Sequence, residues 1–362
     1  MGMLEPGDRI NDTLTVDRRL GEGAYAEVYR VRHEFLGLQA MKLFKRVASL
    51  QETRAMLDEA RLLSKLGHPN IVRLFDANTL QTSEGRRGFF TMEYIAGGSL
   101  DRLVRSHAAS SVPISVAVDA IEQITAALVV AHQQNPPILH RDLTLANVLV
   151  GYDDSGMRVR LSDFGLSKRA DPITQLASAQ GTFAFMAPEV QRLEGYSCAG
   201  DVWSLGTIAY LLLTNHYPFH DGDPFDSFSL ARFRRPAMPP SNYNDEVDSE
   251  LDRIVLAALE RDPRDRIPNA RVLARELRAR REAVAAPEEP PPRSVVRATP
   301  SGDATPEETR AEALAQRALV LAKHPESLHE AADLMEEAVN RSASLREQHL
   351  YRLTLWRRGV MM

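Results

Sequence analysis

The sequence predicts an α+β fold in two lobes, followed by a short all-α unit towards its C-terminal end. Alternating apolar and polar residues predict strands up to about Ala40 and again up to Tyr94, with a helix around Glu59 between them. After Leu100 the apolar spacing becomes mostly helical. The 362 residues, 44% hydrophobic and 26% charged, suffice for a two-lobed core plus an appendage. We therefore expect a small antiparallel β lobe with one helix, then a larger, mainly helical lobe.

A glycine-containing turn interrupts the first strands. Residues 20–28 have the sequence LGEGAYAEV. It begins like a phosphate-binding loop, because Gly21 and Gly23 lack the β-carbons that keep phosphate oxygens away from backbone amides. A Gly-x-Gly run is by itself equally compatible with a plain hairpin turn. Ala26 stands where such loops carry a third glycine.

The next strand and the helix after it present two opposite charges. Alternation over residues 38–44 places Ala40, Lys42 and Phe44 on one face, so Lys42 has apolar neighbours and needs a partner. The apolar stripe of residues 54–66 has helical spacing, and Glu59 interrupts its inner face. We therefore expect Glu59 to pair with Lys42, although a Glu at the border of such a stripe can also extend to water.

The larger lobe begins with an apolar helix and continues into a polar cluster. Within residues 116–132, helical spacing of Ile121, Ile124 and Leu128 indicates a core helix, and His132 at its end is expected to be structural. Residues 140–147, HRDLTLAN, and residues 163–165, DFG, follow it.

The order of polar residues in these two segments is typical of phosphoryl transfer. That reaction needs in-line positioning and neutralisation of negative charge, with little covalent work by the protein. Asp142 is the candidate base that accepts the hydrogen bond of the acceptor hydroxyl. The amide oxygen of Asn147 and the carboxylate of Asp163 are candidate Mg²⁺ ligands, because this hard cation prefers oxygen.

The composition changes after the predicted lobes. Residues 283–304 are rich in Pro, Glu, Ala, Ser and Thr and are predicted to be a linker. Thr305 with Pro306, and again Ser327, are helix-capping patterns, so residues 305–360 are predicted to form a helical tail with a third helix at residues 344–356. One incomplete copy resembles a tetratricopeptide repeat only weakly. Docking on the large lobe or self-association is the expected role, and a groove for partner helices is the alternative.

Charge and cysteine content limit the partners. A formal net charge of −5 and dispersed Lys and Arg residues argue against nucleic acid. The single Cys198 forms no intramolecular disulfide, and we find no secretion signal and no uninterrupted apolar run of membrane-spanning length. We therefore expect a cytoplasmic protein with no membrane partner.

Taken together, these motifs resemble a Hanks-type, eukaryotic-like Ser/Thr protein kinase, a family also widespread in bacteria. The resemblance covers residues 12–282, for which it implies a bilobal protein kinase fold. Further matching segments occur in family order. They are HPNIV at 68–72, MEYIAGGSL at 92–100, GT at 181–182, APE at 187–189, DVWSLG at 201–206 and Arg266.

The resemblance implies a site for ATP together with Mg²⁺, for which Mn²⁺ can substitute. Lys42 would bind the α- and β-phosphates while paired with Glu59, and Leu20, Gly21 and Gly23 would belong to the phosphate loop. The residues expected around adenine are Val28 and Ala40 as the roof, Leu149 as the floor, Met92 as the gatekeeper, and the backbone near Glu93 and Ile95.

It also implies residues that hold geometry rather than react. Asp201 is expected to anchor the backbone of the segment that contains Asp142, and Glu189 is expected to pair with Arg266.

For the segment from residue 163 to 189, the resemblance implies regulation by phosphorylation. Ser178 is the expected site and Thr174 the second, with Arg141 and Lys168 receiving the phosphate. An unmodified polar loop remains the alternative for any single hydroxyl. Thr182 would hydrogen-bond near Asp142 and is typical of the Ser/Thr branch, so we expect protein substrates modified on Ser or Thr.

Substrate selection is inferred from neighbouring positions. Ser99 and Ala146 stand where family members that select arginine carry acids, so selection of upstream arginine is not expected by that route. Residues 183–185, FAF, are expected to line the site for the residue after the acceptor, which favours an apolar residue there.

The main departure from the family is Thr144, which stands where Ser/Thr kinases carry a lysine that touches the γ-phosphate. Loss of this cation predicts reduced or compensated activity. A nucleotide-binding pseudokinase that acts as a scaffold through its tail is therefore the alternative function. A small-molecule phosphotransferase is disfavoured by the GT and APE segments.

Overall fold

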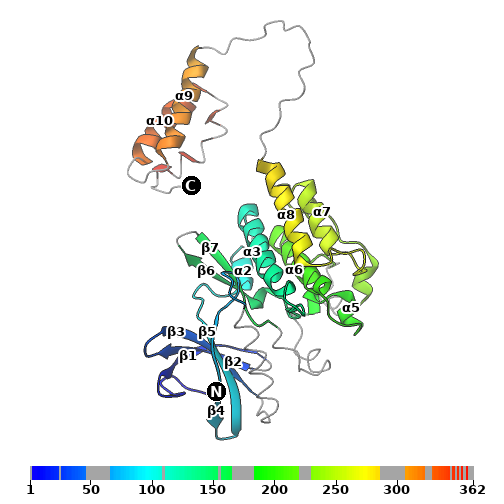
Figure 1. Cartoon of the computed structure of the whole chain (residues 1–362). Coiled ribbons are helices and arrows are strands. Elements are labelled where there is room, and N and C mark those ends of the chain that lie inside the picture. Colours follow the sequence, from blue (N-terminus) through cyan, green and yellow to red (C-terminus); the bar gives the residue numbers. More distant parts are fainter. Residues whose placement is uncertain are drawn as a thin grey trace. The chain divides into compact units, whose positions relative to one another are not determined.

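The computed structural model describes most of the chain as two compact units, residues 1–287 and 288–362 (Figure 1). The described residues are 2–23, 26–45, 66–107, 111–153, 156–164, 183–219, 230–285, 306–322, 328–342, 345–346, 349, 352–353 and 356–357. The first unit contains an antiparallel sheet followed by a group of helices, which confirms the predicted α+β fold of a β lobe and a mainly helical lobe.

The first lobe is built on one five-stranded sheet in the order β1-β2-β3-β5-β4, with all neighbouring strands antiparallel. Its strands are β1 (Leu14–Glu22), β2 (Ala26–His33), β3 (Gly37–Phe44), β4 (Leu74–Thr82) and β5 (Gly85–Glu93). Gly37 and Gly85 have φ of 74° and 134° at the turns before β3 and β5, conformations that L-residues with a β-carbon rarely adopt.

The two faces of the sheet carry different side chains. One face packs an apolar core from β1, β2, β3 and β5. Its buried members are Leu14, Val16, Tyr29, Val31, Met41, Leu43 and Phe89. Alternation along β3 turns Ala40 and Lys42 to the opposite face, as the sequence predicted.

The second lobe is mainly helical, with one small hairpin. Its helices are α2 (Leu100–Ser106), α3 (Ile114–His132), α5 (Pro188–Gln191), α6 (Cys198–Thr214), α7 (Ser249–Ala258) and α8 (Ala270–Ala285). Short 3₁₀ turns occur at η1 (Leu145–Asn147), η2 (Phe183–Phe185), η4 (Leu230–Arg234) and η5 (Pro240–Asn242). The hairpin consists of β6 (Val148–Asp153) and β7 (Gly156–Leu161).

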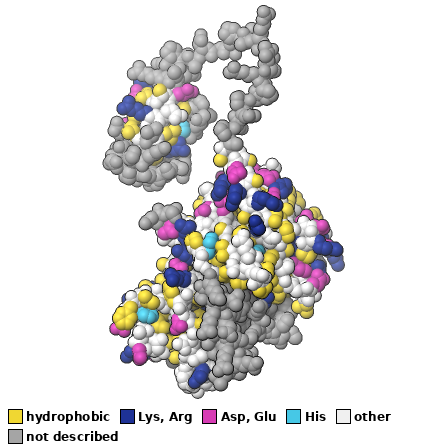
Figure 2. All heavy atoms as spheres, viewed as in Figure 1, with side chains coloured by type: hydrophobic (Ala, Val, Ile, Leu, Met, Phe, Trp, Pro, Cys, Tyr) yellow, Lys and Arg dark blue, Asp and Glu magenta, His cyan; other side chains and the backbone are white. Residues whose placement is uncertain are grey.

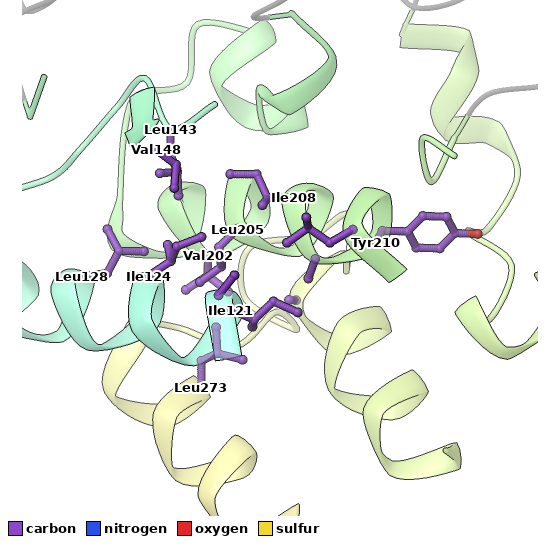
Figure 3. Close-up of a cluster of buried hydrophobic side chains, with 14 of the residues drawn as sticks. Ile121, Ile124, Leu128, Leu143, Val148, Val202, Leu205, Ile208, Tyr210 and Leu273 are labelled. Atoms are coloured by element: carbon purple, nitrogen blue, oxygen red, sulfur yellow. The ribbon is translucent and has the colours of Figure 1, made fainter. Parts of the chain in front are cut away.

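The core of this lobe lies where α3, α6 and α8 meet. Figure 3 shows Ile121, Ile124 and Leu128 of α3 against Val202 and Leu205 of α6, with Leu273 of α8 beside them. Their helical spacing places them on one face of α3, which confirms the predicted core helix.

Helix α3 is apolar enough, over its 19 residues, to cross a membrane by length and composition. Asp119 and Glu122 interrupt the helix, so the expectation that no uninterrupted apolar run reaches that length is not contradicted. A core helix passes the same test, and α3 contributes nine buried residues to this lobe.

A buried ion pair ties the start of α5 to the segment before α8. The Arg266 guanidinium donates to both carboxylate oxygens of Glu189, at 2.7 and 3.0 Å, and to the carbonyl of Ala199 at 2.9 Å. It also lies over the ring of Trp203, 4.9 Å from the centroid. The expected Glu189–Arg266 pair is therefore confirmed.

The second unit is a helical hairpin of α9 (Pro306–Leu321) and α10 (Leu328–Arg341). Both helices begin at the positions that the capping patterns predicted. Small side chains such as Ala311, Ala315 and Ala338 let the two helices approach, and Met335 and Trp356 fill the core between them. The described residues from Leu345 to Arg357 are helical, in line with the predicted third helix.

Replacement of Arg266 by alanine is expected to reduce the free energy of unfolding by about 3–5 kcal/mol, because it leaves the Glu189 carboxylate buried and unpaired. Urea unfolding of the full chain, followed by circular dichroism, measures this change. Arg264→Ala is the matched control, since Arg264 pairs with Asp262 but its side chain is 84% exposed. Equal unfolding midpoints for the two variants would contradict the structural role of the buried pair.

Candidate active site

The backbone of residues 140–142 is held by one carboxylate from the core. Asp201, in the first turn of α6, accepts hydrogen bonds from the N–H of His140 at 2.8 Å and the N–H of Arg141 at 2.9 Å. Arg141 has a φ of 68°, a conformation that is unfavourable for a residue with a β-carbon. Asp201 therefore fixes the backbone at the strained position next to Asp142, as the sequence predicted.

His132 completes the support of Asp201. Its Nδ1 accepts a hydrogen bond from the N–H of Ala270 at 3.3 Å, so its Nε2 carries the hydrogen and donates to Asp201 at 3.0 Å. The side chain is buried and joins the ends of α3 and α8 to α6. This geometry confirms the structural role expected for His132.

Asp142 and Asn147 contact each other across the short η1 turn. The Asn147 Nδ2 group donates to the Asp142 backbone oxygen at 2.7 Å and to the Asp142 carboxylate at 3.0 Å. The Asn147 amide oxygen therefore faces away from these two contacts. Burial raises the pKa of Asp142 above its usual value, and this effect outweighs the opposing effects of His140 and Asn147.

Ser162 connects this pair to Asp163. The Ser162 N–H and hydroxyl both donate to the backbone oxygen of Asn147, at 2.9 and 3.0 Å. Asp163 follows immediately, with a φ of 61°. These two hydrogen bonds from Ser162 explain how Asn147 and Asp163, sixteen positions apart in the sequence, face one site.

Lys42 reaches Asp163 from the sheet. Its Nζ lies 2.8 Å from Asp163 Oδ1, and the two side chains are 17% and 23% exposed. A small cavity lies against this ion pair and is lined by Phe90, Met92, Leu161 and Phe164 among others. The structure thus brings together Lys42, Asp142, Asn147 and Asp163, as predicted from the sequence.

His140 and Phe164 pack beneath these polar groups. Their ring centroids are 4.6 Å apart, and His140 Nε2 donates to the backbone oxygen of Ser162 at 3.0 Å. Burial lowers the pKa of His140, so the ring is neutral at pH 7. The ring therefore supports the backbone before Asp163 without adding positive charge.

Beside the polar groups lies an apolar cluster from both lobes. Ala40 of β3 and Met92 of β5 are buried in it together with Val72, and Leu149 of β6 packs against them. Ala40, Met92 and Leu149, which were predicted as part of the roof, as the gatekeeper and as the floor, thus contact one apolar cluster.

The glycine turn lies at the other end of the same sheet face. Val28 of β2 stands opposite Lys42 in the β2–β3 register, and Gly21 of β1 stands opposite Val28. The Gly23 N–H donates to the Ala26 carbonyl at 2.8 Å, while Leu20 is 36% exposed. The hairpin turn therefore begins one strand away from the Lys42 side chain.

The segment after β5 is held close to β6. The Glu93 N–H donates to the Arg73 carbonyl at 2.9 Å, and its carboxylate lies 3.4 Å from Arg160. A β-carbon on Gly97 would lie 2.2 Å from the carbonyl oxygen of Val150, so only glycine fits there. Ile95, which the sequence predicted at the purine edge, lies between these two fixed points and is partly buried.

The chain is described again from Phe183, where the short η2 turn (Phe183–Phe185) begins. Phe183 and Phe185 are buried and leave Ala184 more accessible, so the rings contribute less to an open apolar site than the sequence suggested. Arg232 donates to the Phe183 carbonyl at 3.0 Å, and Ser204 donates to the Phe185 carbonyl at 2.8 Å.

Some predicted residues lie outside the described part of the chain. They are Glu59, Lys168, Thr174, Ser178 and Thr182. Thr144 is described, is 7% exposed, and forms no side-chain cap to the η1 turn.

Two contacts were missed by the sequence interpretation. The guanidinium of Arg141 lies over the Tyr196 ring, 5.5 Å from its centroid, and Lys42 contacts Asp163 directly. No local pattern in the sequence links either pair of residues.

Comparisons with known proteins agree with this geometry. The family model described as "Protein kinase domain" matches residues 14–277. Serine/threonine-protein kinase PknB of Mycobacterium leprae is 31% identical over 222 residues, 60% of this chain and 34% of that protein. Serine/threonine-protein kinase Pkn1 of Myxococcus xanthus is 33% identical over 256 residues, 69% of this chain and 35% of that protein. The chain thus spans about a third of the length of these two curated relatives.

A solved structure shares the fold. The kinase domain of PknI from Mycobacterium tuberculosis aligns with a TM-score of 0.58 and 24% identity, covering 77% of this chain and 99% of that one.

Replacement of Asp201 by asparagine is expected to accelerate hydrogen exchange at the His140 and Arg141 amides by about tenfold or more. Hydrogen bonds to a charged acceptor contribute about 1.5–3 kcal/mol, and a neutral amide accepts them less well. Hydrogen exchange measured by NMR on the full chain tests this. Asp252→Asn is the control, since Asp252 holds the Ser241 N–H at 2.9 Å, and it should affect that amide instead. Unchanged exchange at His140 and Arg141 in Asp201→Asn would contradict the anchoring role.

Proposed function

The chain belongs to the protein kinase family, and from this we propose that it transfers the γ-phosphoryl group of ATP to Ser or Thr hydroxyls of proteins. The observation that carries the proposal is the convergence of four groups. Asn147 contacts Asp142, Ser162 ties Asn147 to Asp163, and Lys42 closes the site from the sheet. Both lobes therefore contribute to one polar centre beside an apolar cluster.

The oxygen donors suit a hard divalent cation. The amide oxygen of Asn147 and the carboxylate of Asp163 would hold Mg²⁺, and Mn²⁺ could take its place. The metal supplies neutralisation of negative charge on the phosphates of ATP. Lys42 would then bind the α- and β-phosphates, which requires its direct contact with Asp163 to loosen, and Glu59 is the proposed new partner.

Asp142 is the proposed base. Its carboxylate accepts and orients the hydrogen bond of the substrate hydroxyl, whose oxygen forms a bond to the γ-phosphorus as the bond to the β-phosphate oxygen breaks. Because its pKa is raised, Asp142 accepts the hydroxyl proton more readily than an aspartate of ordinary pKa would. Thr144 adds no cation here, so charge neutralisation depends on Lys42 and the metal.

The apolar cluster is the proposed adenine site. Val28 and Ala40 would cover one face of the ring and Leu149 the other, with Met92 behind it. Backbone groups of Glu93 and Ile95 would bind the purine edge. Leu20, Gly21 and Gly23 would lie over the phosphates.

Regulation and partners extend the same proposal. Phosphorylation at Ser178, or at Thr174, would bring a dianion to Arg141 and Lys168. Arg141 would then leave the Tyr196 ring. Thr182 would assist Asp142 and select Ser or Thr as acceptors. Protein substrates lacking an upstream arginine requirement fit Ser99 and Ala146, which bring no carboxylate.

We further propose a cytoplasmic location, with residues 12–282 as the kinase domain, 283–304 as a linker and 305–360 as a separate helical tail for self-association or a partner. Neither nucleic acid nor membrane is a proposed partner. On the face shown in Figure 2, Lys and Arg side chains (dark blue) lie interspersed with Asp and Glu side chains (magenta), and the formal charge of the chain is −5.

Incubation with Mg²⁺ and ATP should place phosphate on Ser or Thr of a general protein substrate and on the chain itself, and Asp142→Asn should reduce both rates by a factor of about 10²–10⁴. Mass spectrometry identifies the modified residues and tests Ser178 and Thr174 directly. Asp262→Asn, which changes a partly exposed acid that pairs with Arg264 away from the site, is the control and should keep the rate of the unmodified chain.

Two outcomes would contradict the proposal. ATP binding without any phosphorylated protein would indicate a scaffold, and phosphate found only on a small molecule would indicate a metabolite phosphotransferase.

A further inference from the structure

A buried acid lies just after the glycine turn and has no part in the site described above. Glu27, the second residue of β2, is 3% exposed, although it stands opposite the solvent-accessible Glu22 of β1. Charged side chains are rarely buried without partners. Its carboxylate accepts hydrogen bonds from the Tyr29 hydroxyl and from the backbone N–H of Met3, the latter at 2.9 Å.

The partner at Met3 belongs to an N-terminal segment, residues 2–10, that runs along the outer face of the sheet. The Leu4 N–H donates to the Tyr29 hydroxyl at 3.0 Å, so adjacent amides contact the two linked side chains. A β-carbon on Gly2 would lie 3.1 Å from the same hydroxyl, which shows how closely the segment approaches β2.

The same segment is also fixed to β1. The Gly7 N–H donates to the Val16 carbonyl at 2.8 Å, and the Val16 N–H donates to the Asp8 carbonyl at 2.9 Å. Met3, Leu4 and Ile10 pack against the apolar core on this face of the sheet. Residues 2–10 therefore contact both strands of the hairpin that carries the glycine turn.

The contacts around Glu27 favour the charged form of its carboxylate. Burial by itself would raise the pKa of Glu27, but the hydrogen bonds from Tyr29 and Met3, with help from Arg19 at 3.9 Å, hold it below its usual value. Burial and the contact with Glu27 raise the pKa of Tyr29 to about 12, so its hydroxyl keeps its hydrogen and donates. A buried carboxylate that lost the Met3 N–H would have to find water, which requires movement of the strand.

Alternation along β2 links this contact to the site. Glu27 and Tyr29 face the outer side, while Val28 between them stands opposite Lys42. Gly23 lies four residues before Glu27, across a turn closed by the Gly23–Ala26 hydrogen bond. A shift of β2 at Glu27 would therefore move both the glycine turn and the residue predicted to cover adenine.

We propose that residues 2–10 act as a brace that holds the glycine turn in position through the Glu27–Tyr29 pair, which makes Glu27 a positioning residue for the nucleotide. This rests on the proposed function only for the identity of the ligand, since the brace itself is a property of the free protein. A brace of this kind affects how tightly phosphates are held rather than the transfer step.

The test uses Glu27→Gln in the full chain, with two measurements. The substitution weakens the hydrogen bonds that Met3 and Tyr29 donate to the charged Glu27 carboxylate, so β2 and the glycine turn are held less firmly. Hydrogen exchange in the absence of nucleotide should therefore accelerate about tenfold at Gly21 and Gly23. The KM for ATP should rise about five- to tenfold, while kcat stays within about twofold. Tyr29→Phe, which removes the hydroxyl but keeps the ring, should change both quantities in the same direction by a smaller factor.

Glu34→Gln is the matched control, since Glu34 carries the same charge at the other end of the hairpin and is exposed. It should leave exchange at the turn and the KM for ATP unchanged. Rapid hydrogen exchange throughout α6 would reveal that Glu27→Gln does not fold. In that case the same two measurements on Tyr29→Phe decide whether the brace exists.

The outcomes separate the brace from the proposed function. Unchanged exchange at Gly21 and Gly23 would overturn the brace even in an active enzyme. Faster exchange with an unchanged KM would also overturn it, because Glu27 would then stabilise only the sheet. If the chain transfers no phosphate, affinity for a fluorescent ATP analogue replaces KM, so the brace is tested although the proposed activity has failed.

Discussion

The Asp201 carboxylate is the interaction on which the rest of the candidate site depends. It is buried in the first turn of α6 and accepts hydrogen bonds from the N–H groups of His140 and Arg141 and from His132. Strained backbone of the kind seen at Arg141 costs about 1–3 kcal/mol and persists only where the surroundings determine it. The packed core of α3, α6 and α8 provides that support (Figure 3), so the position of Asp142 follows from packing far from any substrate.

A second chain of contacts joins the two lobes. Ser162 links Asn147 to Asp163, and Lys42 reaches Asp163 from β3. Each link uses a charged or polar group that is partly shielded from water, where electrostatic interactions are stronger than at the surface. The sheet in turn holds Lys42 and the glycine turn, and residues 2–10 cover the opposite face of that sheet. Nucleotide binding would therefore depend on contacts on both faces of the sheet.

Much of this arrangement could be predicted because it is local in the sequence. Alternation placed Ala40 and Lys42 on one strand face, and capping residues located the starts of α9 and α10. Contacts between distant residues could not be found in this way. An acid next to a glycine turn is expected to be exposed, yet Glu27 is buried because an N-terminal segment supplies its donors. The apolar composition of α3 does not by itself distinguish a core helix from a membrane span, because burial in a core and insertion in a membrane favour the same residues.

The central claim is that Lys42, Asn147 and Asp163 surround one magnesium-bound nucleotide. Calorimetric titration of ATP into the full chain, with Mg²⁺ and with a chelator, tests it most directly. We expect one site per chain whose affinity increases with Mg²⁺, and an Asp163→Asn variant in which this increase is largely lost. Absence of binding, or an affinity that is independent of Mg²⁺ in the unmodified chain, would contradict the account.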